Sequence, residues 1–140
     1  MVLSKACSYA IRALIYAARQ DTDLVPIRKI ADDLGLSFHF LTKIFQTLSN
    51  NDITVSCKGA KGGIKLNYPL DNISLADIVI AVDGRGLFED CLLGLAHCSQ
   101  NPACEIHGKW SQFRAELSEF FETTTLDKLA HKSPPYQLAL

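Results

Sequence analysis

The stretch IADDLGLSFHFLTKI, residues 30–44, decides how this chain folds. Apolar residues recur in it at helical spacing on both sides of a glycine: they are Ile30, Leu34, Leu36, Leu41 and Ile44. Two short helices that meet at a steep angle need a glycine in the turn, here Gly35, and a small residue where their axes approach, here Ala31. The pattern predicts a helix-turn-helix, although taken alone it also fits an ordinary helical hairpin.

Helical signals extend on both sides of this stretch. Apolar periodicity predicts a first helix over residues 4–20. Pro26 suits the first turn of a second helix, which Gly35 ends in a left-handed conformation. Ser37 is the expected N-cap of a third helix, which ends at the Asn50-Asn51 pair. We expect the aromatic rings of Phe38 and Phe40 to lie in the core.

A glycine-rich hairpin is predicted directly after the third helix. The β-favouring segments ITVSC and IKLNY flank KGAKGG, residues 58–63. A basic ribbon after a candidate recognition helix makes a winged helix-turn-helix, which favours DNA binding over the plain hairpin. The candidate DNA-binding residues are Ser37, His39, Thr42, Lys43 and Gln46 on the helix and Lys58 and Lys61 on the wing. Cys57, in a wing strand, is expected to be packed.

The charge is divided unequally along the chain. The net charge is −1, but residues 1–65 hold nine basic against five acidic residues, which leaves +4 there and −5 in the remainder. A basic N-terminal half can follow phosphates, while the acidic half serves another role, such as self-association or sensing. One helix and one wing give modest affinity, so we expect a homodimer that reads two half-sites of double-stranded operator DNA.

The capping-box pair Ser74 and Asp77 predicts a helix at the start of the C-terminal half. A long amphipathic helix is predicted over about residues 104–123, with Trp110, Phe113, Leu117, Phe120 and Phe121 on its apolar face. We prefer pairing of this helix with a second subunit to packing within the monomer. The fold class is thus mostly α with a small β-hairpin. We expect a winged helix-turn-helix domain at 1–83, a cysteine-rich loop at 84–108, and a dimerisation helix and tail at 104–140.

Composition excludes several classes of protein. No apolar run is long enough to span a bilayer, and Lys5 and Arg12 interrupt the apolar pattern at the start, unlike a secretory signal. We therefore expect a cytoplasmic protein without a membrane partner, whose thiols stay reduced. No nucleophile stands with a recognisable base, so an enzyme is not expected.

Residues 91–110, CLLGLAHCSQNPACEIHGKW, concentrate cysteine and histidine. Cys91, Cys98 and Cys104 are separated by six and five residues, and His107 follows. Reversible disulfides, zinc and an iron–sulfur cluster are all compatible with these donors. Structural zinc sites usually bring paired ligands two to four residues apart, whereas longer intervals let a loop wrap a larger group.

Across nearly its whole length the chain resembles the Rrf-two (Rrf2) superfamily of bacterial winged-helix regulators, in particular its iron–sulfur members of the IscR and NsrR type. The motifs that carry the resemblance are SKACSYAIRAL, IADDLGLSFHFLTKIFQTL, KGAKGGIKL, ISLADIVIAVDG, the three cysteines with CEIHGKW, and TLDKLA. It implies a homodimeric, sequence-specific transcription regulator whose DNA affinity is switched by a cluster that responds to redox state, nitric oxide, or iron or cluster supply.

The resemblance also implies ligands. Cys91, Cys98, Cys104 and His107 match the family's ligands, with 2Fe-2S the first choice of cofactor and 4Fe-4S or zinc the alternatives. In some relatives a further ligand comes from the partner's first helix, where Cys7 or Ser8 stands here, although a packed Cys7 is favoured.

Two departures and one alternative remain. The first cysteine interval is one residue longer than in the family members compared, and Ala60-Lys61 replaces the usual proline and glycine of the wing. The alternative is a cluster-free, thiol- or partner-sensing regulator of the same fold, or a zinc-stabilised one. A small redox protein without DNA function is disfavoured by the wing lysines.

Overall fold

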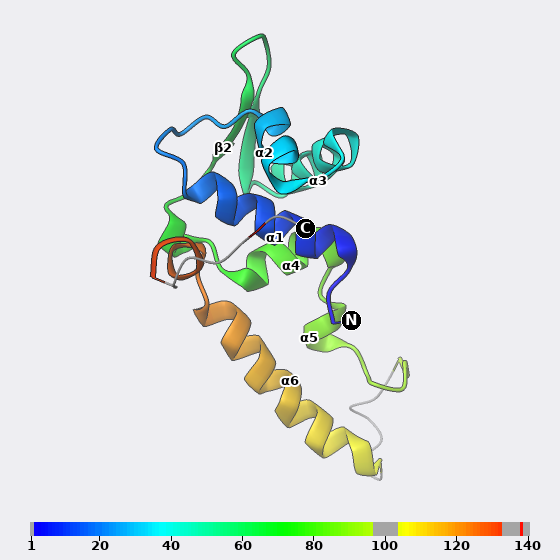
Figure 1. Cartoon of the computed structure of the whole chain (residues 1–140). Helices are drawn as coiled ribbons and strands as arrows, with labels where there is room; N and C mark the ends of the chain where they lie inside the picture. Colours follow the sequence, from blue (N-terminus) through cyan, green and yellow to red (C-terminus); the bar gives the residue numbers. More distant parts are fainter. Residues whose placement is uncertain (1, 97–103, 133–137, 139–140) are drawn as a thin grey trace.

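The computed structural model describes residues 2–96, 104–132 and 138 of the chain (Figure 1). Its elements in order are α1 (Lys5–Ala18), α2 (Ile27–Leu34), α3 (Phe38–Asn50), β1 (Thr54–Cys57), β2 (Gly63–Leu66), the 3-10 turn η1 (Leu70–Asn72), α4 (Leu75–Asp83), α5 (Gly86–Glu89), α6 (Glu105–Thr123) and the π-helical turn η3 (Lys128–Lys132). Figure 1 shows α1 to α4 and the hairpin gathered into one body, from which α6 extends as an arm.

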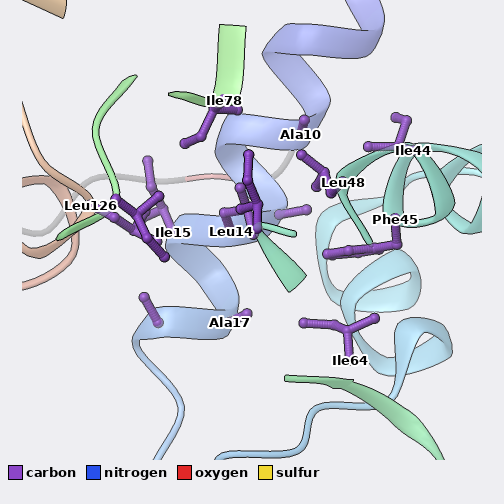
Figure 2. Close-up of a cluster of buried hydrophobic side chains, with 14 of the residues drawn as sticks. Ala10, Leu14, Ile15, Ala17, Ile44, Phe45, Leu48, Ile64, Ile78 and Leu126 are labelled. Carbon is purple, nitrogen blue, oxygen red and sulfur yellow. The ribbon is translucent and has the colours of Figure 1, made fainter. Parts of the chain in front are cut away.

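The core of the body is built around α1. Its fully buried face includes Ala10 and Leu14. Figure 2 shows Ile78 and Leu126 on one side of this helix and Phe45 on the other, so α1 packs against both the helix-turn-helix and the C-terminal elements. Because small and branched side chains alternate on that face, helices can approach α1 from both sides.

The turn between α2 and α3 is the one that the sequence predicts. Gly35 has φ of 66°, a left-handed conformation that ends α2. The next N–H, of Leu36, donates to the Ala31 carbonyl at 2.9 Å. Ser37 is the N-cap of α3, and its hydroxyl accepts from the Phe40 N–H at 3.3 Å. The helix-turn-helix is thereby confirmed.

The wing is a two-stranded antiparallel hairpin in which Thr54 pairs with Leu66 and Cys57 with Gly63. Val25 and Ile64 exchange backbone hydrogen bonds of 2.9 Å, which tie the base of the wing to the segment before α2. A Cβ atom at Gly63 would lie 2.4 Å from the Val25 carbonyl oxygen, so this close approach requires glycine. The predicted hairpin is confirmed.

The C-terminal elements join the body through α4. The predicted capping box is present, since Ser74 and Asp77 exchange their side-chain and backbone hydrogen bonds. The end of α6 docks beside it: the Leu75 N–H donates to the Thr124 carbonyl at 2.9 Å, and Phe121 is buried. The sequence did not indicate α5, which is a single turn. Within the described ranges, no helix is long and apolar enough to cross a membrane.

Three expectations about burial were wrong. The side chains of Phe38 and Phe40 are 36% and 38% exposed, because the buried face of α3 is already filled by Leu41 and Phe45. The Phe40 ring instead makes an edge contact with Tyr9 on the surface. Cys57 is exposed rather than packed, since only the first residue of β1 faces the core.

Candidate functional site

An open groove of about 660 Å³ lies between α3, the start of α2 and the wing. Its walls include Arg28 and Phe38 on one side, Gln46 on α3, and Lys58 with Gly62 on the wing. A Cβ atom at Gly62 would lie 2.4 Å from the Cys57 carbonyl oxygen, so glycine keeps this wall close to the strand. The groove therefore presents polar and cationic side chains on a backbone that glycine allows to pack tightly.

Helical periodicity explains which side of α3 faces the groove. Leu41, Ile44, Phe45 and Leu48 are buried against the body. The opposite stripe, at steps of three and four residues, is formed by Phe38, Thr42, Gln46 and Ser49, all of which line the groove. The helix is thus divided into a side that holds the fold and a side available to a ligand.

The predicted DNA-binding residues separate into two groups. Thr42, Gln46 and Lys58 line the groove itself. Ser37, His39, Lys43 and Lys61 are exposed but lie outside its lining. The Thr42 hydroxyl donates to the Phe38 carbonyl at 2.8 Å, which leaves only its acceptor side for a ligand.

Sequence reasoning missed several residues of this groove. Ser49 could have been found, because it continues the stripe through Thr42 and Gln46. Arg28 could not, since it belongs to α2 and only the tertiary structure brings it beside Phe38.

A second hollow, of about 410 Å³, lies where the segment after α5 faces the beginning of α6. Cys91 and His107 both line it, and both are half-buried. Cys104 is the N-cap residue of α6, and its carbonyl accepts from the His107 N–H at 3.1 Å. Cys98 and its neighbour His97 lie outside the described residues. Of the four expected ligands, the structure thus brings Cys91 and His107 to one hollow and places Cys104 about one helical turn before His107.

The wall of this hollow is fastened by two side chains of α6. The indole N–H of Trp110 donates to the Asp90 carbonyl at 2.9 Å, and the Arg114 guanidinium donates to the same oxygen at 3.0 Å and to the Glu89 carbonyl. Trp110 and Arg114 stand three and seven residues after His107, on the same side of the helix. They therefore hold the backbone just before Cys91 against the helix that carries His107. Sequence spacing did not indicate this role for Arg114.

The chemistry of these donors fits a soft metal or an iron–sulfur group. Thiolates and an imidazole are suitable ligands for iron–sulfur clusters and zinc, and the hollow has room for more than one ion. Within residues 2–96 and 104–132, no three histidine, cysteine or acidic side chains form a metal-binding group. In the same ranges the buried Nε of Arg114, a residue that lines this hollow, lacks a hydrogen-bond partner.

Cys7 lies apart from this hollow. Its side chain is fully buried within its own chain. Burial, together with the nearby Asp83 carboxylate, raises the pKa of the Cys7 thiol to about 12. The adjacent Ser8 is partly exposed. This geometry suits Cys7 as a packing residue, because thiolate formation there is strongly disfavoured.

Comparison with known proteins agrees with this architecture. The family model described as Rrf2, iron-dependent transcriptional regulator, matches residues 3–132. The chain belongs to the Rrf2 family. It is 33% identical over 132 residues to an HTH-type transcriptional regulator of Aquifex aeolicus, covering 92% of this chain and 91% of the relative. The family is one of transcriptional regulators, not enzymes.

Named regulators of the Rrf2 type are more distant in sequence. NsrR of Oceanobacillus iheyensis is 28% identical and covers 92% of this chain and 89% of its own. IscR of Klebsiella pneumoniae is 27% identical and covers 94% of this chain and 80% of its own.

Solved structures show the same winged-helix fold. CymR, the global cysteine regulator of Bacillus subtilis, superposes with a TM-score of 0.76 at 24% identity over 94% of this chain and 98% of its own. The oxidised form of Staphylococcus aureus CymR gives 0.72 at 25% identity over 96% of this chain and all of the other. The expected fold class is therefore confirmed.

Proposed function

We propose that this Rrf2 protein is a homodimeric transcription regulator that binds operator DNA through α3 and the wing, and that an iron–sulfur cluster changes its affinity for that DNA. The observation that carries the proposal is the pairing of two surfaces in one chain. One is the groove between α3 and the wing, whose lining includes Arg28, Gln46 and Lys58. The other is the hollow that Cys91 and His107 share.

DNA binding is supported by the chemistry and shape of the first surface. Gln46 can donate to and accept from base edges, and the adjacent Lys43 is exposed on the same helix. Lys58 and Lys61 extend the cationic surface along the wing, where phosphates would lie. A recognition helix in the major groove with a wing beside it accounts for each of these positions.

Dimer formation is supported by the unpartnered side of α6. Phe113 and Phe120 are 53% and 56% exposed, and Ile106 is 41% exposed. A nineteen-residue helix that buries only Phe121 in its own chain has little internal support. We infer that a second copy of α6 covers these side chains, which would bring two DNA-binding bodies to one operator.

The proposed cluster ligands are Cys91, Cys98, Cys104 and His107, with 2Fe-2S the first choice and 4Fe-4S or zinc as alternatives. A bound cluster would supply a redox-active group that oxidants, nitric oxide or iron shortage can alter. The chain's own contribution is to hold Cys91 against α6 through Trp110 and Arg114.

A packed route connects this hollow to the DNA-binding surface. The end of α6 lies against α4, and α4 packs against both α1 and α3. The Asn51 side chain, at the end of α3, donates to the Ala81 carbonyl of α4 at 3.5 Å. A change at the start of α6 can therefore shift the position of α3 through rigid helices, provided that the two states differ in free energy.

A cluster-free thiol sensor of the same fold is the second candidate. The similarity to CymR, which has also been solved in an oxidised form, favours it. In that case Cys91, Cys98 and Cys104 would act through reversible oxidation, without iron.

One preparation tests both candidates. Protein purified without air should show visible absorption and contain iron and sulfide, while Cys98→Ala should lack both and remain folded. His107→Ala should retain a labile cluster, because three thiolates remain. Colourless wild type with neither iron nor sulfide, whose DNA affinity nevertheless changes with a thiol oxidant, would support the second candidate instead.

A further inference from the structure

One cation in the groove is held by an aromatic ring and by nothing else among the described residues. The Arg28 guanidinium lies 4.0 Å from the centroid of the Phe38 ring. Over residues 2–96, 104–132 and 138, it takes part in no hydrogen bond or ion pair. Arg28 lines the groove, so its N–H donors, which have no acceptor among the described residues, are available to a ligand there.

The neighbouring Lys29 provides a contrast. Its ammonium group donates to the Tyr16 hydroxyl at 2.8 Å and to the Asp33 carboxylate at 3.2 Å. These contacts, with the Tyr16 hydroxyl first, raise the pKa of Lys29. Hydrogen bonds from the Tyr16 hydroxyl and then from Lys29 lower the pKa of Asp33. The two adjacent cations of α2 thus differ. Lys29 forms an ion pair with Asp33, whereas Arg28 has no acidic partner among the described residues.

The contact with Arg28 explains why an exposed aromatic ring is useful at position 38. An arginine side chain has many rotamers, and fixing it in a binding geometry costs conformational entropy. Contact with an aromatic face restricts the guanidinium plane before a ligand arrives, while its edge donors remain available. A phenylalanine at the start of the recognition helix is therefore more useful at the surface than in the core.

We propose that Arg28, held on the Phe38 ring, is a phosphate-binding residue that fixes the register of the protein on DNA. This inference rests on the proposed DNA-binding function. Arg28 lies in the first turn of α2, and in a helix-turn-helix the first helix crosses the DNA backbone while the second reads the bases. The guanidinium edge matches two phosphate oxygens, which carry no sequence information.

The test compares neighbouring charges in the full chain. The ligands are a duplex that the wild type selects from a random library and a scrambled duplex of equal length, both measured by fluorescence anisotropy between low and high salt. Arg28→Gln should weaken binding to both duplexes by about tenfold, since it removes a charged hydrogen bond. The slope of log affinity against log salt should become less steep by roughly 0.9 for each arginine removed. The matched control, Lys29→Gln, should change both quantities far less.

The ring is tested by a double-mutant cycle. Phe38→Leu keeps an apolar side chain but removes the π face, and should weaken binding by roughly two- to fivefold. Arg28→Gln should then cost less in the Phe38→Leu background than in the wild type. If the free-energy costs of Arg28→Gln and Phe38→Leu simply add, the Phe38 ring does not position Arg28 for binding.

The outcomes separate this inference from the proposed function. If the wild type binds DNA but Arg28→Gln and Lys29→Gln behave alike, Arg28 is not a phosphate contact and the groove proposal stands. If Arg28→Gln changes which sequence is preferred while leaving the salt slope unchanged, the residue reads bases, and the inference is again overturned. A wild type that binds neither duplex at low salt would remove the DNA-binding function and this inference with it.

Discussion

The body and the α6 arm of this Rrf2 protein are stabilised in different ways. α1 alone buries seven residues, among them Cys7, Ala10 and Leu14, whereas the longer α6 buries one, Phe121. The body therefore holds most of the hydrophobic core, while the apolar side of α6 is exposed and available to the second subunit that we propose. The groove between α3 and the wing thus lies on the well-packed body, whereas the cysteine-rich segment lies beside a helix with few buried residues.

The largest expected effect separates buried from exposed leucines. Leu14→Ala, at a fully buried position of α1, should lower the free energy of unfolding by about 2–5 kcal/mol. The matched change Leu92→Ala, at a side chain that is 55% exposed in the cysteine segment, should alter it by less than about 0.5 kcal/mol. Denaturant unfolding measures both. Equal costs would show that the segment after α5 is supported as strongly as the core.

The next effect concerns the partner of the arm. Phe113→Lys should convert a dimer into monomers, because two-fold symmetry brings the added charge into the apolar contact from both subunits. Gln112→Lys adds the same charge at the adjacent exposed residue and should leave the dimer intact. Light scattering at micromolar concentration distinguishes them. A monomeric wild type would contradict the pairing of α6.

A smaller effect is expected on the wing. Replacing Lys58 and Lys61 with alanine should weaken binding to all duplexes alike and reduce the salt slope by about 0.9 for each phosphate that the wing no longer neutralises. The control pair, Lys5→Ala with Lys109→Ala, removes equal charge from exposed positions outside the groove. Unchanged affinity in the wing variant, measured by anisotropy, would exclude the wing from DNA binding.

The smallest effect should appear in sequence preference. Gln46→Ala removes a side chain on the groove stripe of α3 and should lower discrimination at one base pair by about 1–3 kcal/mol, with little change in salt dependence. Selection from a random library before and after the substitution measures this. An identical selected sequence would mean that Gln46 does not read bases.

Local signals predicted much of the body, because its helices begin and end with short-range interactions. The caps at Ser37 and Ser74 and the left-handed Gly35 each involve residues within a few positions of one another. Such interactions can be read directly from the sequence. The hairpin was predictable for the same reason, since a glycine-rich tip joins two strands that are adjacent in the chain.

What the sequence did not reveal depends on contacts between distant residues. Phe38 and Phe40 were assigned to the core by residue type, although the α3 core positions were already occupied. Arg114 acts on the Asp90 carbonyl, 24 positions away, and no periodic pattern reports such a contact. Cys91 and His107 were indicated by resemblance, but their common hollow appears only when α5 and α6 are folded together.

The central claim is that the cysteine-rich segment controls DNA binding, and the most direct test is operator affinity of one preparation with and without its cluster. Protein purified without air and the same protein after cluster removal should be titrated at one salt concentration against a duplex selected from a random library. We predict affinities that differ by roughly 5–150-fold, the usual range of coupling between two sites. Equal affinities, with the cluster present in one sample and absent from the other, would contradict it.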